Sequence, residues 1–164
     1  MFNTVRVGAW LLCVIVVSGC ETVAQGPLYA ESKATQEKPG YATLYVFRDY
    51  AEPTALGSSI HIDGKHVVTL NQRGYTWVYL KPGNRNLQAV WAPLSGQKDA
   101  TLLLDVVAGM TYYVDVTGTV KYVGMYGLAN YYVTDSRMNG ISADAAEPKL
   151  EQCCKYQKPA VSTY

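Results

Sequence analysis

From residue 41 onward, short apolar runs alternate with clusters of turn-forming residues. The runs are rich in Val, Tyr, Thr, Ile and Leu, and Gly, Pro, Asn and Asp separate them. Alternating runs of this length and spacing are typical of the strands of an all-β sandwich. The pattern predicts strands over residues 42–49, 59–63, 66–70, 75–80, 86–91, 101–107, 111–117 and 131–134.

Three turns connect these predicted strands. Asp-Gly at residues 63–64 stands between two alternating runs, and both residue types tolerate the positive φ of a two-residue type I′ hairpin. Pro-Gly at residues 82–83 fits a type II turn and predicts a second hairpin. Ala-Gly at residues 108–109 predicts a third. Successive hairpins would make a meander of antiparallel neighbours.

The period changes near the C-terminus, where residues 142–156 are rich in helix-forming residues. Pro148 fits such a helix best in its first turn, which predicts a short helix over residues 147–156. The face of this helix that would pack on a sheet carries Leu150, Cys153 and Cys154. Residues 157–164 are expected to form a frayed tail. The predicted fold class is therefore mostly β: an antiparallel β-sandwich with a short C-terminal helix.

The first 20 residues have a different pattern. One Arg precedes an almost unbroken apolar stretch, which ends in Val17-Ser18-Gly19-Cys20. Such a stretch is too short for a stable membrane-spanning helix and is typical of an export signal. Small residues before a Cys make the run a lipobox, so residues 1–19 are predicted to be a lipoprotein signal peptide and Cys20 to carry lipid. The rival interpretation is an ordinary secretory signal cleaved after Gly19.

Residues 20–40 follow as a polar, aperiodic stretch containing Gln, Lys, Glu, Ser and Pro, the composition of a flexible tether. The sandwich would then span residues 41–156, with residues 157–164 as its tail. Glu21, directly after Cys20, favours the outer membrane over the inner one by enterobacterial sorting habits. The predicted location is the cell envelope, lipid-anchored and facing the periplasm.

Charge narrows the choice of partners. The chain carries 14 Lys and Arg against 13 Asp and Glu, and Arg6 leaves with the signal peptide, so the mature chain is formally neutral. Neutrality argues against nucleic-acid binding, which needs a clustered basic face, and against a polybasic patch for anionic lipid. Lipid on Cys20 and an envelope protein are the expected partners.

The order of segments YATLYVFRDY, IHIDGKHVVTL, GYTWVYLKPGNRNLQAVW and VVAGMTYYVDV, behind a lipobox and a tether, resembles a family of bacterial envelope lipoproteins described only as a domain of unknown function. The resemblance covers roughly residues 40–156. It implies an immunoglobulin-like or transthyretin-like sandwich, and the hairpin-bearing middle is also similar to the PEGA-type module of surface proteins. The family has no agreed activity, so the resemblance assigns no catalytic residue.

Two adjacent cysteines remain once Cys13 leaves with the signal and Cys20 is lipidated. Cys153 and Cys154 could be one buried and one exposed thiol, a vicinal disulfide, or a link to another chain. Because no Cys-x-x-Cys motif or His pair lies nearby, an inert role is favoured over an envelope thiol-redox role.

An aromatic strand face is the main candidate for ligand binding. Tyr75, Trp77 and Tyr79 alternate along one predicted strand and therefore share a face. If the opposite face looks into the sandwich, these three rings form an outer platform for a sugar or a partner protein. The alternatives are that the C-terminal helix covers this face, or that the aromatic face is itself the core.

Two further regions are weaker candidates. His61 and Asp63 share a strand face, but simple alternation places His66 elsewhere, so no metal site is predicted. Residues 118–130, GTVKYVGMYGLAN, mix Gly with Tyr, Val and Met without clean alternation. Such a segment is typical of a glycine-kinked edge strand or of a ligand or partner loop.

The sequence contains no nucleophile elbow, zinc-protease helix or phosphate loop, and no catalytic constellation assembles from it. A non-enzymatic role without cofactor or metal is therefore expected. The leading hypothesis is an envelope lipoprotein that presents a β-sandwich for protein-protein contacts. The alternatives are a carbohydrate or small-ligand module using Tyr75, Trp77 and Tyr79, and a redox role for Cys153 and Cys154.

Overall fold

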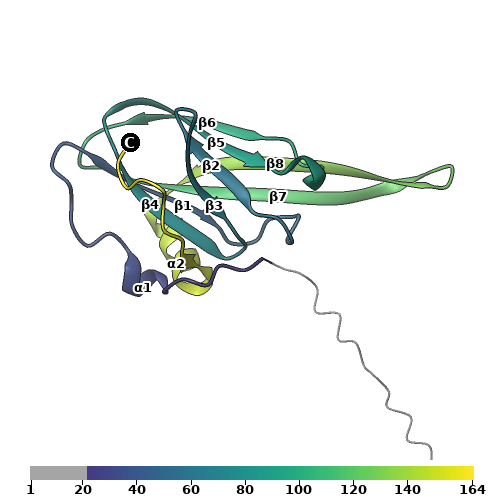
Figure 1. Ribbon diagram of the computed structural model, residues 1–164, viewed down its shortest axis with the longest axis horizontal. Coiled ribbons are helices and arrows are strands. Elements are labelled where there is room, and N and C mark those ends of the chain that lie inside the picture. The colour runs from purple at the N-terminus through teal and green to yellow at the C-terminus, as the bar shows by residue number, and fades with distance from the viewer. Residues whose placement is uncertain (1–21) are drawn as a thin grey trace, which may run out of the picture.

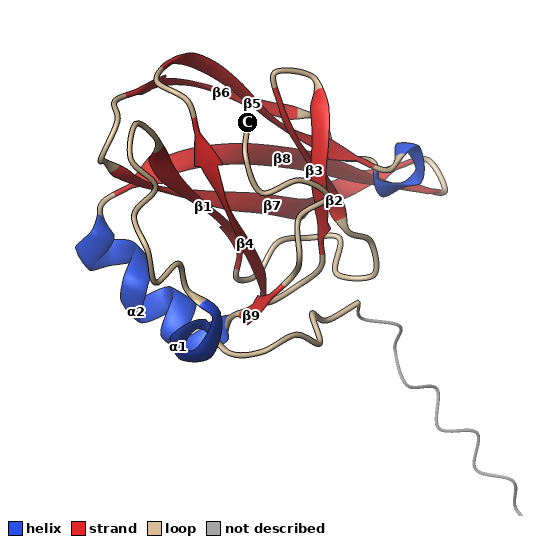
Figure 2. Ribbon diagram, turned by 60° about the vertical axis from the view of Figure 1, so that its left-hand side comes forward, coloured by secondary structure: helices blue, strands red, loops and turns tan. Residues whose placement is uncertain are grey.

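The computed structural model describes residues 22–164, so the predicted signal peptide and Cys20 lie outside the described residues. Two β-sheets pack face to face, with two short helices at one side (Figures 1 and 2). The predicted sandwich with a short C-terminal helix is confirmed. In chain order the elements are α1 (Tyr29–Ser32), β1 (Ala42–Arg48), β2 (Ser58–Ile62), β3 (Lys65–Leu70), β4 (Gly74–Leu80), β5 (Gly83–Trp91), η1 (Pro93–Ser95, a 3₁₀ turn), β6 (Ala100–Val106), β7 (Thr111–Tyr126), β8 (Ala129–Ile141), α2 (Ala143–Cys153) and β9 (Lys155–Tyr156).

The strand order is β8-β7-β1-β4-β9 in one sheet and β3-β2-β5-β6 in the other. Asp63 and Gly64 have φ values of 50° and 76°, and they close the predicted antiparallel hairpin of β2 and β3. At the centre of the larger sheet β1 pairs antiparallel with β4 and parallel with β7. This parallel pair makes the sheet mixed, which the sequence did not predict.

The predicted meander is wrong at two of its three turns. Strands β4 and β5, on either side of Pro82-Gly83, belong to different sheets, and so do β6 and β7 around Ala108-Gly109. These turns pass the chain from one layer to the other. Turn residues determine where a chain reverses, but not whether the next strand pairs with its predecessor or crosses the core.

The main core fills the space between the sheets. Strand β1 contributes Leu44 and Val46, and β4 contributes Val78 and Leu80, all of them buried. They face side chains from the second sheet such as Leu87. The sandwich therefore buries the aliphatic side of β4, and the aromatic side of that strand points away from the main core.

A second core lies on the outer face of the larger sheet, where both helices pack (Figure 2). Its centre is a cluster of aromatic rings from three strands and α1, covered by Leu150 of α2. The rings of Tyr45 and Tyr113 are stacked, with centroids 5.2 Å apart. The cluster consists of Tyr29, Tyr45, Phe47, Tyr75 and Tyr113.

Residues 22–40 are not a flexible tether, contrary to the prediction. Ala24 and Tyr29 are buried, and the backbone N–H of Ala24 donates to the carbonyl of Gln72 at 2.9 Å. Leu28 forms a β-bridge with Lys155. A few small or aromatic residues placed at the right points are enough to dock an otherwise polar segment, and composition alone does not reveal them.

The C-terminal predictions also need correction. Helix α2 begins directly after Ser142, one turn earlier than predicted, and contains the exposed Pro148 in its interior. The tail is not frayed, because it runs beside β4: the N–H of Tyr79 donates to Ser162 at 2.9 Å, and the N–H of Tyr164 donates to Tyr79 at 2.9 Å.

Arg48, at the end of β1, is fully buried and organises the loop of residues 49–57. Its guanidinium donates to the carbonyls of Leu56, Leu70, Ala51 and Pro53, at 2.7 to 3.1 Å. It also lies over the ring of Trp91, 4.8 Å from the ring centroid. One charged side chain thus satisfies four carbonyls, two of them through fully buried hydrogen bonds.

Candidate contact surface

Strands β7 and β8 form a long hairpin that runs far beyond the body of the sandwich (Figure 1). Residues 122–133 form the outer part of this hairpin, called the tip below. Tyr122 pairs with Tyr132, and a bulge follows before Gly124. Gly127 at the turn has φ of 61°, which suits glycine. The segment at residues 118–130 is therefore a glycine-kinked strand pair, one of the two predicted alternatives.

The tip exposes its large apolar side chains to solvent. Tyr126 is 88% exposed and Leu128 is fully exposed. Large exposed apolar groups that gather in one place usually mark a contact surface. The others that are at least half or nearly half exposed in this segment are Tyr122, Val123, Met125, Tyr131, Tyr132 and Val133.

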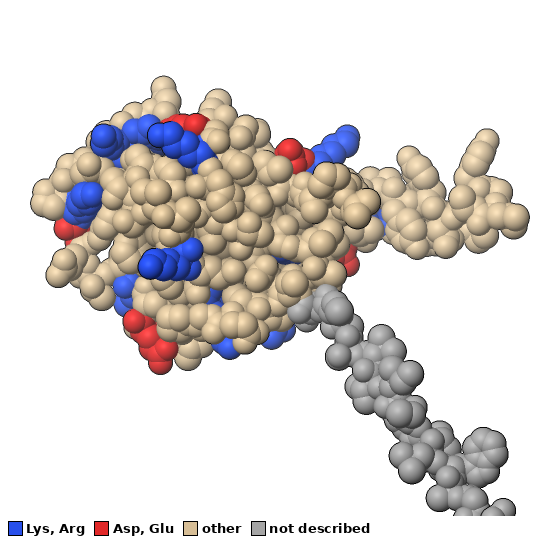
Figure 3. Space-filling view, viewed as in Figure 1, with Lys and Arg blue, Asp and Glu red and all other residues tan. Residues whose placement is uncertain are grey.

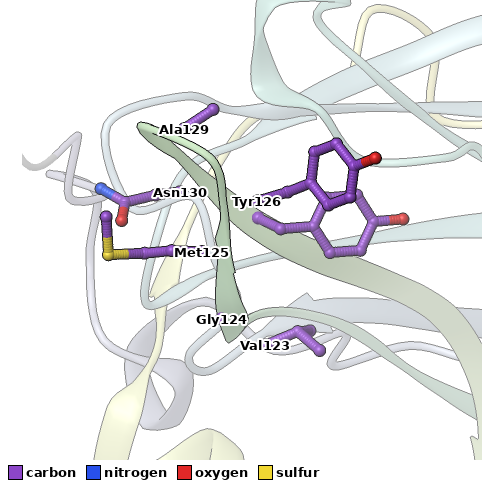
Figure 4. Close-up of a pocket in the computed structure, with 7 residues that line it drawn as sticks. Val123, Gly124, Met125, Tyr126, Ala129 and Asn130 are labelled. Atoms are coloured by element: carbon purple, nitrogen blue, oxygen red, sulfur yellow. The ribbon is translucent and has the colours of Figure 1, made fainter.

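Apolar side chains occupy both faces of the tip. Tyr126 points to the opposite side of the ribbon from Met125 and Asn130 (Figure 4). Tyr122 and Tyr132 share one face, with ring centroids 5.6 Å apart in an edge-to-face contact. The outer end of the hairpin forms an open pocket with a volume of about 480 Å³. A surface of this kind can be covered completely only by a medium or partner that surrounds it.

The tip also lacks charge. Between Lys121 and Asp135 the sequence contains no Lys, Arg, Asp or Glu, and the outer hairpin is uniformly uncharged in Figure 3. The nearest ion pair on the hairpin joins Arg137 and Asp135 at 2.8 Å, closer to the body. Contacts at the tip therefore rest on apolar burial and tyrosine hydroxyls.

The predicted aromatic platform lies under the N-terminal segment. Tyr75 is buried, and its hydroxyl is 2.7 Å from Ser32 Oγ. Trp77 Nε1 donates to the carbonyl of Ser32 at 2.8 Å, and the hydroxyl of Tyr79 donates to the carbonyl of Gln36 at 2.7 Å. The three side chains do share a face, as predicted, but the chain itself covers this face, so they do not form an open platform.

A polar cleft of about 320 Å³ remains where residues 33–37 pass over this face. The hydroxyl of Tyr113 donates to Glu147 Oε1 at 2.8 Å. Burial, and then the bond to this carboxylate, raise the pKa of Tyr113 well above its ordinary value, and burial raises the pKa of Tyr29 to about 12. Both phenols stay protonated at neutral pH, so neither serves as a base, and Tyr113 donates its proton to the carboxylate of Glu147.

Cys153 and Cys154 form a vicinal disulfide, one of the predicted alternatives. Cys154 is buried in the second core, whereas Cys153 borders a shallow surface pocket with Arg73 and Lys149. The pair joins the end of α2 to β9. The burial of Cys154 in the second core fits a structural role for that half of the pair.

His61 and His66 lie closer together than alternation predicted. A β-bulge after Ile60 shifts the register, so the two residues pair across β2 and β3, with ring centroids 5.4 Å apart. Asp63 is already engaged, accepting from the N–H of Asn86 and from Arg85. Within residues 22–164 no group of three or more His, Cys, Asp or Glu side chains could hold a metal ion.

No family model, curated protein or solved structure matches the chain. The resemblance to an envelope-lipoprotein family therefore stays a prediction. In the part of the chain that the structure describes, no helix is long and apolar enough to cross a membrane.

The sequence indicated the tip only as a weaker candidate surface. Its sequence signal was the run of uncharged residues 122–133 with aromatic, Val, Leu and Met side chains. Such a run is equally compatible with a buried strand, and only the three-dimensional arrangement shows that the run lies outside the body.

Proposed function

We propose that this chain is an envelope lipoprotein, anchored by lipid on Cys20 at the outer membrane and facing the periplasm, that presents a non-enzymatic β-sandwich for protein-protein contacts. The observation that carries the proposal is the hairpin of β7 and β8, which extends past the body. Strand β8 is 13 residues long and ends its sheet, so among the described strands it pairs with β7 alone. A long sheet edge can accept a strand from a partner.

The part of β8 next to the body is held firmly enough to serve as such an edge. The hydroxyl of Thr134 donates to the carbonyl of Gly96 at 2.8 Å, and Trp91 Nε1 donates to Ser136 Oγ at 2.7 Å. Met138 is buried in the main core. One face of this stretch is therefore fixed to the sandwich, and among the described strands none pairs with its outer edge.

The packing of the aromatic residues weighs against the carbohydrate-binding alternative. The rings that a sugar would stack on are packed against α1, α2 and the N-terminal segment. The carbohydrate-binding alternative would need Tyr75, Trp77 and Tyr79 to release these contacts. No specific observation favours it.

Site-specific photocrosslinking in intact cells tests the protein contact. A photoreactive residue at exposed Arg137 or Asn139, on β8, is expected to give a discrete adduct with one envelope protein. The same residue at exposed Lys65, the first residue of β3 in the other sheet, is the matched control. Absence of a β8-specific adduct under several growth conditions would contradict the proposed contact.

Mass spectrometry of the mature protein tests the anchor separately. The expected N-terminal peptide begins at Cys20 and carries a diacylglyceryl group and an acyl chain. A mature chain with an unmodified Cys20 would contradict the lipoprotein assignment.

A further inference from the structure

The link between the lipid and the body would be much shorter than the tether predicted over residues 20–40. The first described residue, Thr22, already forms hydrogen bonds with the body. The N–H of Thr22 donates to the carbonyl of Thr54 at 3.3 Å, and the N–H of Gln72 donates to the carbonyl of Thr22 at 2.9 Å. Two residues, Cys20 and Glu21, then separate the lipid from packed structure. At a maximum of about 3.5 Å per residue, two residues reach at most about 7 Å, so a bilayer that holds the lipid must lie close to Thr22.

The same loop that holds Thr22 also holds the root of the hairpin. Thr54 belongs to this loop of residues 49–57, and so does Glu52. The N–H of Glu52 donates to the carbonyl of Gly118 at 2.8 Å, and its carboxylate accepts from the N–H of Val120. The attachment point of the anchor and the starting point of the hairpin are therefore neighbours on the body.

The hairpin is long enough to reach the membrane from this position. From Val120 to Tyr126 the strand extends about 20 Å at roughly 3.3 Å per residue. The tip thus lies within a few tens of ångströms of Thr22, on a body that the short link would keep at the surface.

We infer that the tip, residues 122–133, is inserted in the interfacial region of the bilayer that holds the lipid of Cys20, as a second membrane contact. The inference rests on the lipid anchor of the proposed function. Its chemistry fits a lipid interface: Tyr122, Tyr126, Tyr131 and Tyr132 have apolar rings with polar ends, and Leu128 at the turn is fully exposed. Because the tip is apolar on both faces, a bilayer covers it better than one flat protein surface would.

Two features set the depth and the lipid preference. The projecting ribbon has two strand edges whose backbone groups need hydrogen-bond partners, and hydrocarbon provides none. The tip therefore sits in the headgroup and upper acyl region, about 5 to 10 Å deep. Since residues 122–133 contain no Lys or Arg, insertion does not require anionic lipid.

Fluorescence of the lipidated full-length protein in phosphatidylcholine vesicles tests the inference. With Cys20 lipidated and Cys153 bonded to Cys154, a Leu128→Cys variant offers one thiol for an environment-sensitive dye. We expect a several-fold rise in emission with a blue shift, and quenching by lipids that carry a shallow nitroxide. A Lys65→Cys variant, labelled the same way, is expected to show neither.

A charge placed beside the label provides a second test. Tyr126→Asp in the Leu128→Cys protein should reverse most of the rise in emission, because burying a carboxylate at the interface is costly. Leu103→Asp, at another exposed apolar position on β6, should leave the signal unchanged. Equal signals from the two variants would overturn the inference.

The outcomes separate the inference from the proposed function. A Leu128 label that stays as solvent-exposed as the Lys65 label overturns tip insertion, even if Cys20 carries lipid. A photoreactive residue at Leu128 that crosslinks to a protein in cells, with no lipid quenching in vesicles, assigns the tip to a protein partner and overturns the inference as well. Loss of the lipid itself would instead contradict the proposed function.

Discussion

At the scale of single residues, the structure depends on a few polar side chains that are buried with their partners. Arg48 is the clearest case, because a residue type that is almost always exposed lies fully inside the fold. It replaces the hydrogen bonds that the loop of residues 49–57 would otherwise make with water. This loop in turn positions both Thr22 and the root of the hairpin.

Replacing Arg48 with Met is expected to destabilise the fold by about 3 kcal/mol or more, because four carbonyls lose a charged donor and two of these hydrogen bonds are fully buried. Urea unfolding of the variant would measure the loss. Arg137→Met, which removes an exposed guanidinium, serves as the control and should change the unfolding free energy very little. Similar midpoints for both variants would contradict the role given to Arg48.

Tyr75 illustrates a second residue-scale effect, a dependence of stability on pH. Burial raises the pKa of Tyr75 to about 12, from an ordinary value of 10.0. The folded state therefore holds this proton more tightly than the unfolded chain does. The stabilisation is fully present below pH 10 and is lost as the pH rises from about 10 to 12.

Tyr75→Phe should therefore make unfolding less steeply dependent on pH in the alkaline range, while costing about 1 kcal/mol at neutral pH through the lost contact with Ser32. Urea unfolding at a series of pH values, with tyrosinate absorbance as a second readout, checks both effects. Tyr126→Phe, at an exposed position, should change neither. An unchanged alkaline slope in the Tyr75 variant would contradict this account.

At the scale of elements, the sequence predicted local features well and spatial relations less well. The Asp-Gly hairpin at residues 63–64 formed as expected, because its positive φ values are a property of the two residues themselves. The Pro-Gly turn at residues 82–83 has similar turn chemistry but connects different sheets. Which sheet receives the next strand depends on core contacts between distant segments, and no local pattern encodes them.

The same distinction explains the outcome at the candidate sites. Alternation correctly placed Tyr75, Trp77 and Tyr79 on one face, but the cover over them comes from residues that look like a tether in sequence. A bulge after Ile60 brought His61 and His66 together, and bulges leave no reliable signal in a short strand. The sequence pattern could not show that the tip projects from the body, because an exposed apolar strand and a buried one can have the same pattern of residues.

Hydrogen exchange tests the docked N-terminal segment directly. The amides of Ala24 and Lys33 should be protected, since they donate to Gln72 and Tyr29 at 2.9 and 3.0 Å. The amide of Tyr156, which donates to Pro27, should be protected with them. Exchange of the Ala24 amide at the rate of an unstructured peptide would contradict the docked segment and support a flexible tether.

At the scale of the whole molecule, the sandwich and the tip are separable parts. The body closes its two cores without help from residues 122–133, whose large apolar side chains are about half exposed or more. Because neither core includes a residue of the tip, we expect the body to fold and remain stable without it.

Joining Tyr122 to Tyr132 through a two-residue Asn-Gly turn should shorten the hairpin and preserve the fold. These residues pair directly across the ribbon, which is the geometry that a type I′ turn requires. The unfolding free energy should stay within about 0.5 kcal/mol of the parent value. Circular dichroism and urea unfolding would check this, and a large loss of stability would show that the tip supports the body.

The parallel pairing of β1 with β7 has a consequence for when the protein folds. The first long strand needs β7 beside it, and Leu28 meets Lys155 near the opposite end of the chain. Contacts between segments so far apart in sequence form late, because the loop between them must close first. A chain still under synthesis therefore lacks the strands that complete its central sheet. The export that we propose for this chain requires an unfolded state, and a topology that leaves the central sheet incomplete until β7 is available would preserve that state.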